Sequence, residues 1–255
     1  DLLTKALTST LNNGVSLILS ANLHSLSLKS TSEENQLLDL WAIIESILKI
    51  SNSHTSDRID QICQYMVPII KRKYIYSLIE QVALDIKNYD IGKYNEIIND
   101  ANSDFERIYQ VAAFISLESY AKQRDEWLDN IKDFPLLKLR INKYTSMLKT
   151  RGSLTSYIER HALKVQWQLM RAYRNRNLII HNGTTTSYTS LLIENLHSYV
   201  DALLTHVITC FADGLDITSI RQELFCRECD WMEKTKDKKN KTAIDEEFLR
   251  IVLQM

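Results

Sequence analysis

One short segment combines side chains suited to acid–base chemistry on a phosphate ester. Residues 173–183 read YRNRNLIIHNG, which places two arginines and three asparagines close to His181. An imidazole can donate or accept a proton near neutral pH, whereas a guanidinium stays charged and stabilises anions. With no set of metal ligands beside them, a histidine and an arginine suit transesterification of RNA. In that reaction a base removes the 2′-hydroxyl proton and a cation stabilises the phosphorane.

Arg176 interrupts the apolar face of the helix that the sequence predicts from Ser153 to Asn182. That face follows steps of four and three residues and comprises Ile158, Ala162, Val165, Leu169, Ala172, Arg176 and Ile179. Because a guanidinium cannot lose its proton, it needs an anion, a carboxylate or water at this position. One interpretation is a structural ion pair with Glu45, a carboxylate on the apolar face of an earlier predicted helix. The other is an arginine that binds phosphate.

Helical geometry leaves the choice of arginine open. Positions five apart point about 140° away from each other on a regular helix, so Arg176 and His181 do not share a face. Either the last turn is distorted, or the site combines side chains from two chains. Arg174 also fits, since it lies about 20° from His181 on the helical wheel. We prefer Arg176 for its place on the apolar face, and Arg171 and Arg174 then become candidate phosphate contacts, with solvation as the alternative. The structural alternative for His181 is a favourable contact with the helix C-terminus.

The composition indicates that long helices position these residues. The 255 residues include only 5 Gly and 2 Pro, too few for many tight turns and hairpins. We expect helices over residues 1–12, 15–30, 31–50, 56–86, 102–131, 135–149, 153–182 and 190–212. The alternation of apolar residues and serine in 15–30 also suits a strand, but nothing nearby offers a hairpin partner. A helical tail follows from Thr218, interrupted by a solvated lysine-rich loop at 234–241. Thr31 and Glu34 have the spacing of a capping box, and Pro68 is expected to kink or divide its helix.

Charge and cysteine content bound the partners and the compartment. There are 31 basic and 32 acidic residues, so a site for a polyanion must be built locally. Four cysteines are too few for a disulfide framework and suit a reducing cytosol. No apolar run approaches the roughly 20 residues of a membrane span. We therefore expect a cytoplasmic protein that needs no cofactor and no membrane. A structural zinc held by His206, Cys210, Cys226 and Cys229 is an alternative to reduced thiols.

The segment RNLIIH matches R-N-x-x-x-H, the signature of the HEPN superfamily (higher eukaryotes and prokaryotes nucleotide-binding domain). In many members this is a metal-independent ribonuclease motif. Together with the upstream segment ENQLLDLWAIIESIL, the chain resembles the ApeA-like branch of HEPN proteins. That branch pairs a helix bearing tryptophan and glutamate with a later helix end of the form R-N-x-x-x-H-x-G. The resemblance covers roughly residues 35–212.

The resemblance implies a fold and roles for particular residues. The fold would be an all-α, HEPN-like helical bundle with a C-terminal helical extension. Its parts would be a helical lead-in at 1–30, the HEPN-like domain at 31–212 and the extension at 213–255. Arg176 and His181 would be the catalytic pair, Asn177 the polar residue that orients them, and Glu45 the group that organises the arginine. HEPN ribonucleases usually act as dimers with a shared cleft, so we expect a homodimer that acts on RNA.

The activity implied by the resemblance is that of a metal-independent endoribonuclease, acting as a toxin or anti-phage defence effector. A chain that begins at Asp1 leaves room for an upstream sensor domain or a partner protein. Two alternatives belong to other classes. One is a HEPN module without catalysis that serves dimerisation or nucleotide binding, and the other is a structural helical protein in which Arg176 and Glu45 form an interior ion pair. RNA cleavage in the presence of EDTA would distinguish the metal-independent ribonuclease from both alternatives.

Overall fold

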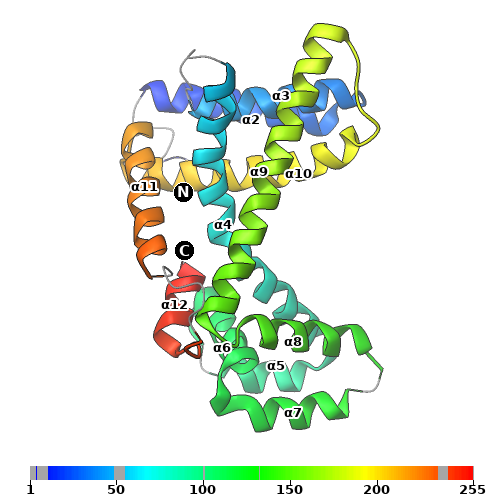
Figure 1. The fold of residues 1–255 in the computed structure, drawn as a ribbon, viewed down its shortest axis with the longest axis vertical. Coiled ribbons are helices and arrows are strands. Elements are labelled where there is room, and N and C mark those ends of the chain that lie inside the picture. The colour runs from blue at the N-terminus through cyan, green and yellow to red at the C-terminus, as the bar shows by residue number, and fades with distance from the viewer. Residues whose placement is uncertain are drawn as a thin grey trace. The chain divides into compact units, whose positions relative to one another are not determined.

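The computed structural model describes residue 4 and residues 11–48, 55–99, 101–131, 133–234 and 241–254. This part of the chain consists of helices and their connections and has no β-strand, so the expected all-α class is confirmed (Figure 1). Most of the helix expected over 1–12 and most of the lysine-rich loop lie outside the described residues. Within the described ranges, no single helix is long and apolar enough to cross a membrane. Only the bent pair of helices at 189–212 and 217–234 passes that test when the two are taken together.

The chain forms two compact units. Unit 1 comprises residues 1–70 and 162–231, and unit 2 comprises residues 71–161 and 232–255. Two long helices, α4 (Thr55–Tyr89) and α9 (Arg151–Asn182), each contribute to both units. The division does not follow the expected boundaries at residues 30 and 212. Pro68 lies inside α4 without dividing it.

Unit 1 holds the segment that carries Arg176 and His181. It contains α2 (Leu11–Lys29), α3 (Glu33–Leu48), the start of α4, the second part of α9, α10 (Thr189–Ala212) and most of α11 (Ile217–Lys234). The core consists mainly of aliphatic side chains together with Trp41, which is 1% exposed. Helices α2 and α10 both pack against α3. The apolar face predicted for α9 is buried in this core at Val165, Leu169, Ala172 and Ile179, so the opposite face of the helix is directed outward.

A serine cap fixes the start of α3. The hydroxyl of Ser32 accepts a hydrogen bond from the backbone N–H of Asn35 at 3.2 Å, and α3 begins at Glu33. The capping box predicted at Thr31 and Glu34 is therefore wrong by one residue. Ser32 also donates its hydroxyl proton to the Glu34 carboxylate at 2.7 Å, so Glu34 bonds the capping hydroxyl itself. Ser32 is therefore the N-cap residue, since its hydroxyl accepts from an open N–H group at the start of the helix.

The end of α9 is fixed by a glycine and by a buried asparagine. The helix ends at Asn182, as predicted, and Gly183 follows with φ of 64°, a conformation that glycine adopts without steric cost. Asn175 is 1% exposed and donates from Nδ2 to the hydroxyl of Thr189 at 2.7 Å. That hydroxyl donates in turn to the carbonyl oxygen of Thr186 at 2.7 Å. The start of α10 is thereby tied to the last turns of α9.

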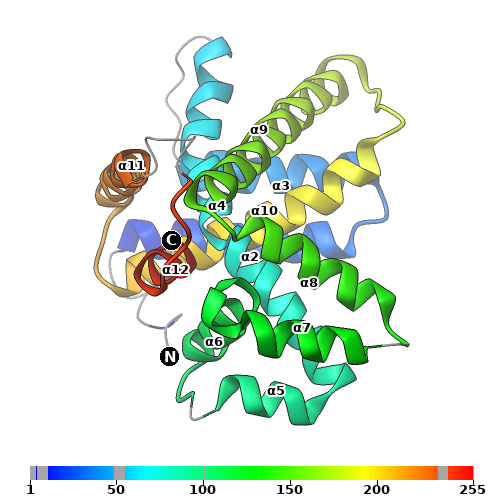
Figure 2. The same cartoon turned by 60° about the horizontal axis from the view of Figure 1, so that its bottom comes forward.

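Unit 2 contains the remainder of α4 and α9 and a group of shorter helices (Figure 2). These are α5 (Ile91–Ile98), α6 (Asp104–Ser116), a 3-10 turn at Glu118–Tyr120, α7 (Ala121–Asn130), α8 (Pro135–Met147) and α12 (Glu246–Gln254). Pro135 opens α8 as predicted, at a position where the missing N–H has no helical partner.

The single helix expected over residues 102–131 is wrong, because the chain breaks after Ser116. The buried side chain of Arg124 explains the break. Its Nη1 donates to the carbonyl oxygens of Phe114 and Ile115 at 3.1 and 2.8 Å, and to that of Leu117 at 3.4 Å. Carbonyls at the end of a helix need partners, and here a cationic side chain from the next helix supplies them.

Candidate functional site

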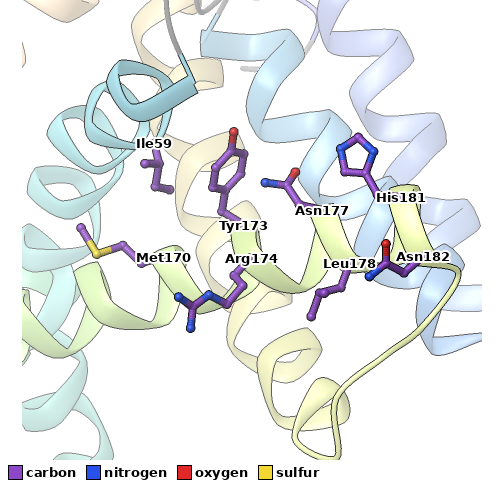
Figure 3. A pocket seen from close by; sticks show the side chains of 8 residues that line it. All are labelled: Ile59, Met170, Tyr173, Arg174, Asn177, Leu178, His181 and Asn182. Carbon is purple, nitrogen blue, oxygen red and sulfur yellow. The ribbon is translucent and has the colours of Figure 1, made fainter.

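A pocket of about 500 Å³ lies beside the C-terminal part of α9, entirely among residues of unit 1 (Figure 3). Helix α9 supplies all but one of the lining residues, and α4 supplies the other. The pocket is lined by Ile59, Met170, Tyr173, Arg174, Asn177, Leu178, His181 and Asn182. Apolar walls with a few converging polar groups are the usual character of a site for a small ligand or a base.

Three of the residues predicted to act on RNA line this pocket, namely Arg174, Asn177 and His181. Figure 3 shows Tyr173, Asn177 and His181 projecting from α9 at successive turns, and the side chain of Arg174 extending in a different direction. His181 is exposed at the end of the helix, so its imidazole is accessible to a ligand in the pocket. The pocket thus places a proton-transfer group, an amide and a cation around one volume.

The carboxylate of Glu45 contacts hydrogen-bond donors on three helices. Its Oε1 accepts a hydrogen bond from Trp41 Nε1 at 2.8 Å. Its Oε2 lies 3.2 Å from Arg58 Nη2 and 3.8 Å from Arg176 Nη2. All three charged side chains are partly buried, at 16% exposed for Glu45, 27% for Arg58 and 23% for Arg176. The structure therefore contains the ion pair between Arg176 and Glu45 that the helix pattern suggested.

Two guanidinium groups share this single carboxylate. Arg58 is the closer partner of Glu45, so the group formed by these three side chains keeps one unit of positive charge. Arg176 has five N–H donors, of which only a few are occupied by the contacts around it. A surplus positive charge that is partly screened from water favours the binding of an anion. A phosphate group beside Arg176 would balance the charge.

Arg176 also fixes the orientation of Asn177. Its Nη1 lies 3.0 Å from Asn177 Oδ1. Because a guanidinium can only donate hydrogen bonds, the carbonyl end of the amide must face it. The Nδ2 donors of Asn177 are then left for a ligand in the pocket. The sequence Arg176–Asn177 therefore connects the ion-paired group at Glu45 with the pocket.

Within one copy of the chain, Arg176 and His181 do not converge on one point. Helix α9 remains an α-helix up to Asn182. A distorted last turn, which could have brought the two side chains together, is therefore not observed. Positions five apart on such a helix diverge by about 140°, and Arg176 is not among the residues that line the pocket. Within one copy, the pocket therefore contains His181 but not Arg176.

Two residues of the site were missed by sequence reasoning. Tyr173 lines the pocket and packs against Trp41, with ring centroids 5.6 Å apart. Its position at the start of the quoted segment was a signal that could have been used. Arg58 had no such signal, because its role depends on how the first turns of α4 lie next to Glu45. Arg171, predicted as a phosphate contact, is exposed on α9 outside the pocket lining.

The four residues weighed as zinc ligands lie on two helices. His206 Nε2 and Cys210 Sγ are 3.7 Å apart on α10, and Cys210 is buried. Cys226 and Cys229 are exposed on α11. Among the residues that the structure describes, no three histidine, cysteine or acidic side chains are grouped so that they could hold a metal ion.

Three histidines away from the pocket, His24, His161 and His197, pack against other rings. In unit 1 the His24 and His197 rings lie 5.6 Å apart, and His24 Nε2 lies 3.4 Å from Asp201 Oδ1. Burial, and to a smaller extent the His24 ring, lowers the pKa of His197. In unit 2 the His161 ring stacks on Tyr74 with centroids 3.5 Å apart. These contacts favour a structural role for the three histidines.

Comparison with models of known protein families, with curated proteins and with solved structures found no match for this chain. Function is therefore inferred from the motif and from the geometry of the pocket and of the ion-paired group beside it.

Replacing Glu45 with alanine should lower the free energy of unfolding by about 2–4 kcal/mol. The substitution leaves two partly buried guanidinium groups and the Trp41 N–H without their shared acceptor, and breaking a buried ion pair typically costs about 3–5 kcal/mol. Because all three charged side chains are partly exposed to water, the expected cost is lower than that typical value. Urea unfolding measures the loss. Glu33→Ala, on an exposed position of the same helix, should change stability by less than about 0.5 kcal/mol. Equal effects of the two variants would mean that Glu45 does not organise the arginines.

Proposed function

We propose that this protein is a metal-independent endoribonuclease that cleaves RNA by transesterification at a site formed jointly by two copies of the chain. The observation that carries the proposal is the surplus positive charge at Arg176, held between Glu45 and Asn177 next to the pocket that contains His181. The match to the R-N-x-x-x-H motif supports the same assignment.

In the proposed reaction, His181 acts as the general base and removes the proton of the 2′-hydroxyl. The 2′-oxygen then attacks the adjacent phosphorus, and the guanidinium of Arg176 stabilises the charge of the phosphorane. The bond from phosphorus to the 5′-oxygen breaks, and an imidazolium protonates the leaving oxygen. That imidazolium is the same His181, which carries the proton taken from the 2′-hydroxyl. The products are a 2′,3′-cyclic phosphate and a 5′-hydroxyl.

A homodimer is part of the proposal, because the regular helix directs Arg176 and His181 away from each other within one chain. A twofold axis near the end of α9 would bring the arginine of one copy to the histidine of the other. Arg174, which lines the pocket with His181, would then hold a neighbouring phosphate of the bound RNA. The role of a toxin or anti-phage defence effector rests on the family resemblance alone.

A second candidate function is supported by the ion pair between Arg176 and Glu45. An arginine with a carboxylate partner also suits a helical module that dimerises or binds a nucleotide without cleaving RNA. The two candidates differ in the fate of RNA and not in the fold.

Incubation of the purified protein with total RNA in excess EDTA tests the proposal. Cleavage should continue in EDTA, because the Arg–His scheme uses no metal, and every new 5′ end should carry a hydroxyl. DNA and 2′-O-methyl RNA should resist cleavage since neither offers the nucleophile. End-labelling with and without prior phosphatase treatment identifies the termini. Products with a 5′-phosphate, or loss of all cleavage in EDTA, would contradict the proposed chemistry, and intact RNA under all conditions would favour the non-catalytic module.

A further inference from the structure

The C-terminal part of α9 has an unusual charge pattern. Residues 162–182 include Lys164, Arg171, Arg174 and Arg176 but no aspartate or glutamate, although the whole chain has a net charge of −1. In the part of the chain that the structure describes, no carboxylate lies within ion-pairing distance of Lys164, Arg171 or Arg174. Arg176, in contrast, faces Glu45. Among the described residues, these three cations therefore have no carboxylate partner.

Large apolar side chains are exposed on the same stretch of helix. Leu163 is 49% exposed, Trp167 57% and Met170 36%. On the helical wheel, Trp167, Met170, Arg174 and His181 fall within about 60° of one another. The indole of Trp167 therefore lies on the side of α9 that carries His181, about 21 Å away along the helix axis. Three of these four side chains line the pocket, namely Met170, Arg174 and His181.

We propose that this side of α9, from Leu163 to His181, binds single-stranded RNA and leads the strand into the pocket. An unpaired base stacks on the indole of Trp167, and Lys164, Arg171 and Arg174 contact phosphates. This proposal rests on the proposed function for the identity of the strand. Exposed aromatic side chains between cations are the usual means of holding a single strand, because every base has a face that can stack. A base-paired strand keeps its bases stacked in the helix, so it cannot use the indole in this way.

Charge argues against a second copy of the chain as the occupant of this surface. Two copies that met symmetrically around Trp167 would place the cations of one against the same cations of the other. Since residues 162–182 contain no acid, that contact would be repulsive. A polyanion has the complementary charge. The proposed dimer needs contact only near the end of α9, where Glu45 offsets part of the positive charge of Arg176. The surface around Trp167 is left to the RNA.

Binding of a 2′-O-methyl oligonucleotide of roughly ten nucleotides tests the proposal, because its length falls within known single-strand site sizes and it lacks the nucleophile. Trp167→Ala should weaken binding by roughly 5- to 100-fold, the usual effect of losing one stacked base. Trp167→Phe should restore part of the affinity, and Arg171→Ala should reduce the salt dependence of binding. The matched control is Phe225→Ala on α11, an aromatic side chain that is 63% exposed and should leave binding unchanged. The blunt-ended duplex of the same sequence should compete poorly.

Two results would overturn this proposal. One is an unchanged affinity of Trp167→Ala for the oligonucleotide. The other is a Trp167→Ala variant that changes its association state in sedimentation but binds the oligonucleotide as tightly per dimer as the wild type, which would make the surface a protein interface. The outcomes also distinguish failure of the RNA-binding surface from failure of the proposed ribonuclease activity. Cleavage of RNA in EDTA with no effect of Trp167→Ala on oligonucleotide binding removes the strand-binding surface alone. Binding that depends on Trp167, without cleavage of RNA by the wild-type protein, removes the ribonuclease alone.

Discussion

Replacing His181 with alanine is expected to slow RNA cleavage by on the order of 10²–10⁴-fold, the usual contribution of one positioned proton-transfer group. The side chain is exposed at the last turn of α9 and lines the pocket, so its loss removes little packing. Thermal unfolding of the variant should therefore match that of the wild type. Single-turnover cleavage of a labelled oligonucleotide measures the rate.

The neighbouring residue supplies the control for this prediction. Ile180 is 49% exposed and does not line the pocket, so Ile180→Ala should retain nearly the full rate. A His181→Ala variant that cleaves as fast as Ile180→Ala would remove His181 from the reaction. The base would then have to be sought among other side chains near the pocket.

Replacing Arg176 with alanine should reduce cleavage by about 10²–10³-fold, the usual effect of losing one preorganised group that stabilises the transition-state charge. The effect on stability should be small, no more than about 1–2 kcal/mol. Glu45 keeps Arg58 at 3.2 Å and the Trp41 N–H at 2.8 Å after the change, so its charge is not stranded. Arg174→Ala should instead weaken RNA binding more than it slows the chemical step. Titrating substrate under single-turnover conditions separates the two effects.

Mixing two inactive variants tests whether the site is shared between copies. In a heterodimer of Arg176→Ala and His181→Ala chains, one of the two sites regains an arginine from one copy and a histidine from the other. Co-expression of the two variants should therefore restore a measurable fraction of the wild-type rate. If no activity returns although heterodimers form, both residues must act within one chain. A larger rate loss from Arg174→Ala than from Arg176→Ala would make Arg174, which shares the pocket with His181, the catalytic arginine.

Long helices with strong local signals were predicted well from the sequence. The extent of α10, the proline at the start of α8 and the glycine after α9 all depend on residues within the element itself. The break between α6 and α7 was missed because it depends on a tertiary contact. The guanidinium of Arg124 turns back to carbonyls seven to ten residues earlier, and no periodic pattern encodes that contact. The two-unit division was missed for a similar reason, because α4 and α9 each serve both units without a change in composition.

Periodicity identified Arg176 and Glu45 as polar residues on apolar faces, and the structure places them together. It could not show that Arg58 competes for the same carboxylate, because that depends on the relative placement of α3 and α4. Nor could it show that Arg174, and not Arg176, lines the pocket with His181. The assignment of the chain to the HEPN superfamily stays a prediction.

The two-part origin of unit 1 has a consequence for how the chain folds. Its segments end at residue 70 and resume at residue 162, so they can meet only after the intervening chain has closed a long loop. The entropy lost on closing a flexible loop grows with the number of residues in it. Compaction of residues 71–161 into their own unit shortens that loop and lowers its entropic cost. Contacts with large sequence separation, such as the one between Trp41 and Tyr173, form slowly in general. We therefore expect assembly of the pocket to be a late event in folding that depends on helices outside unit 1.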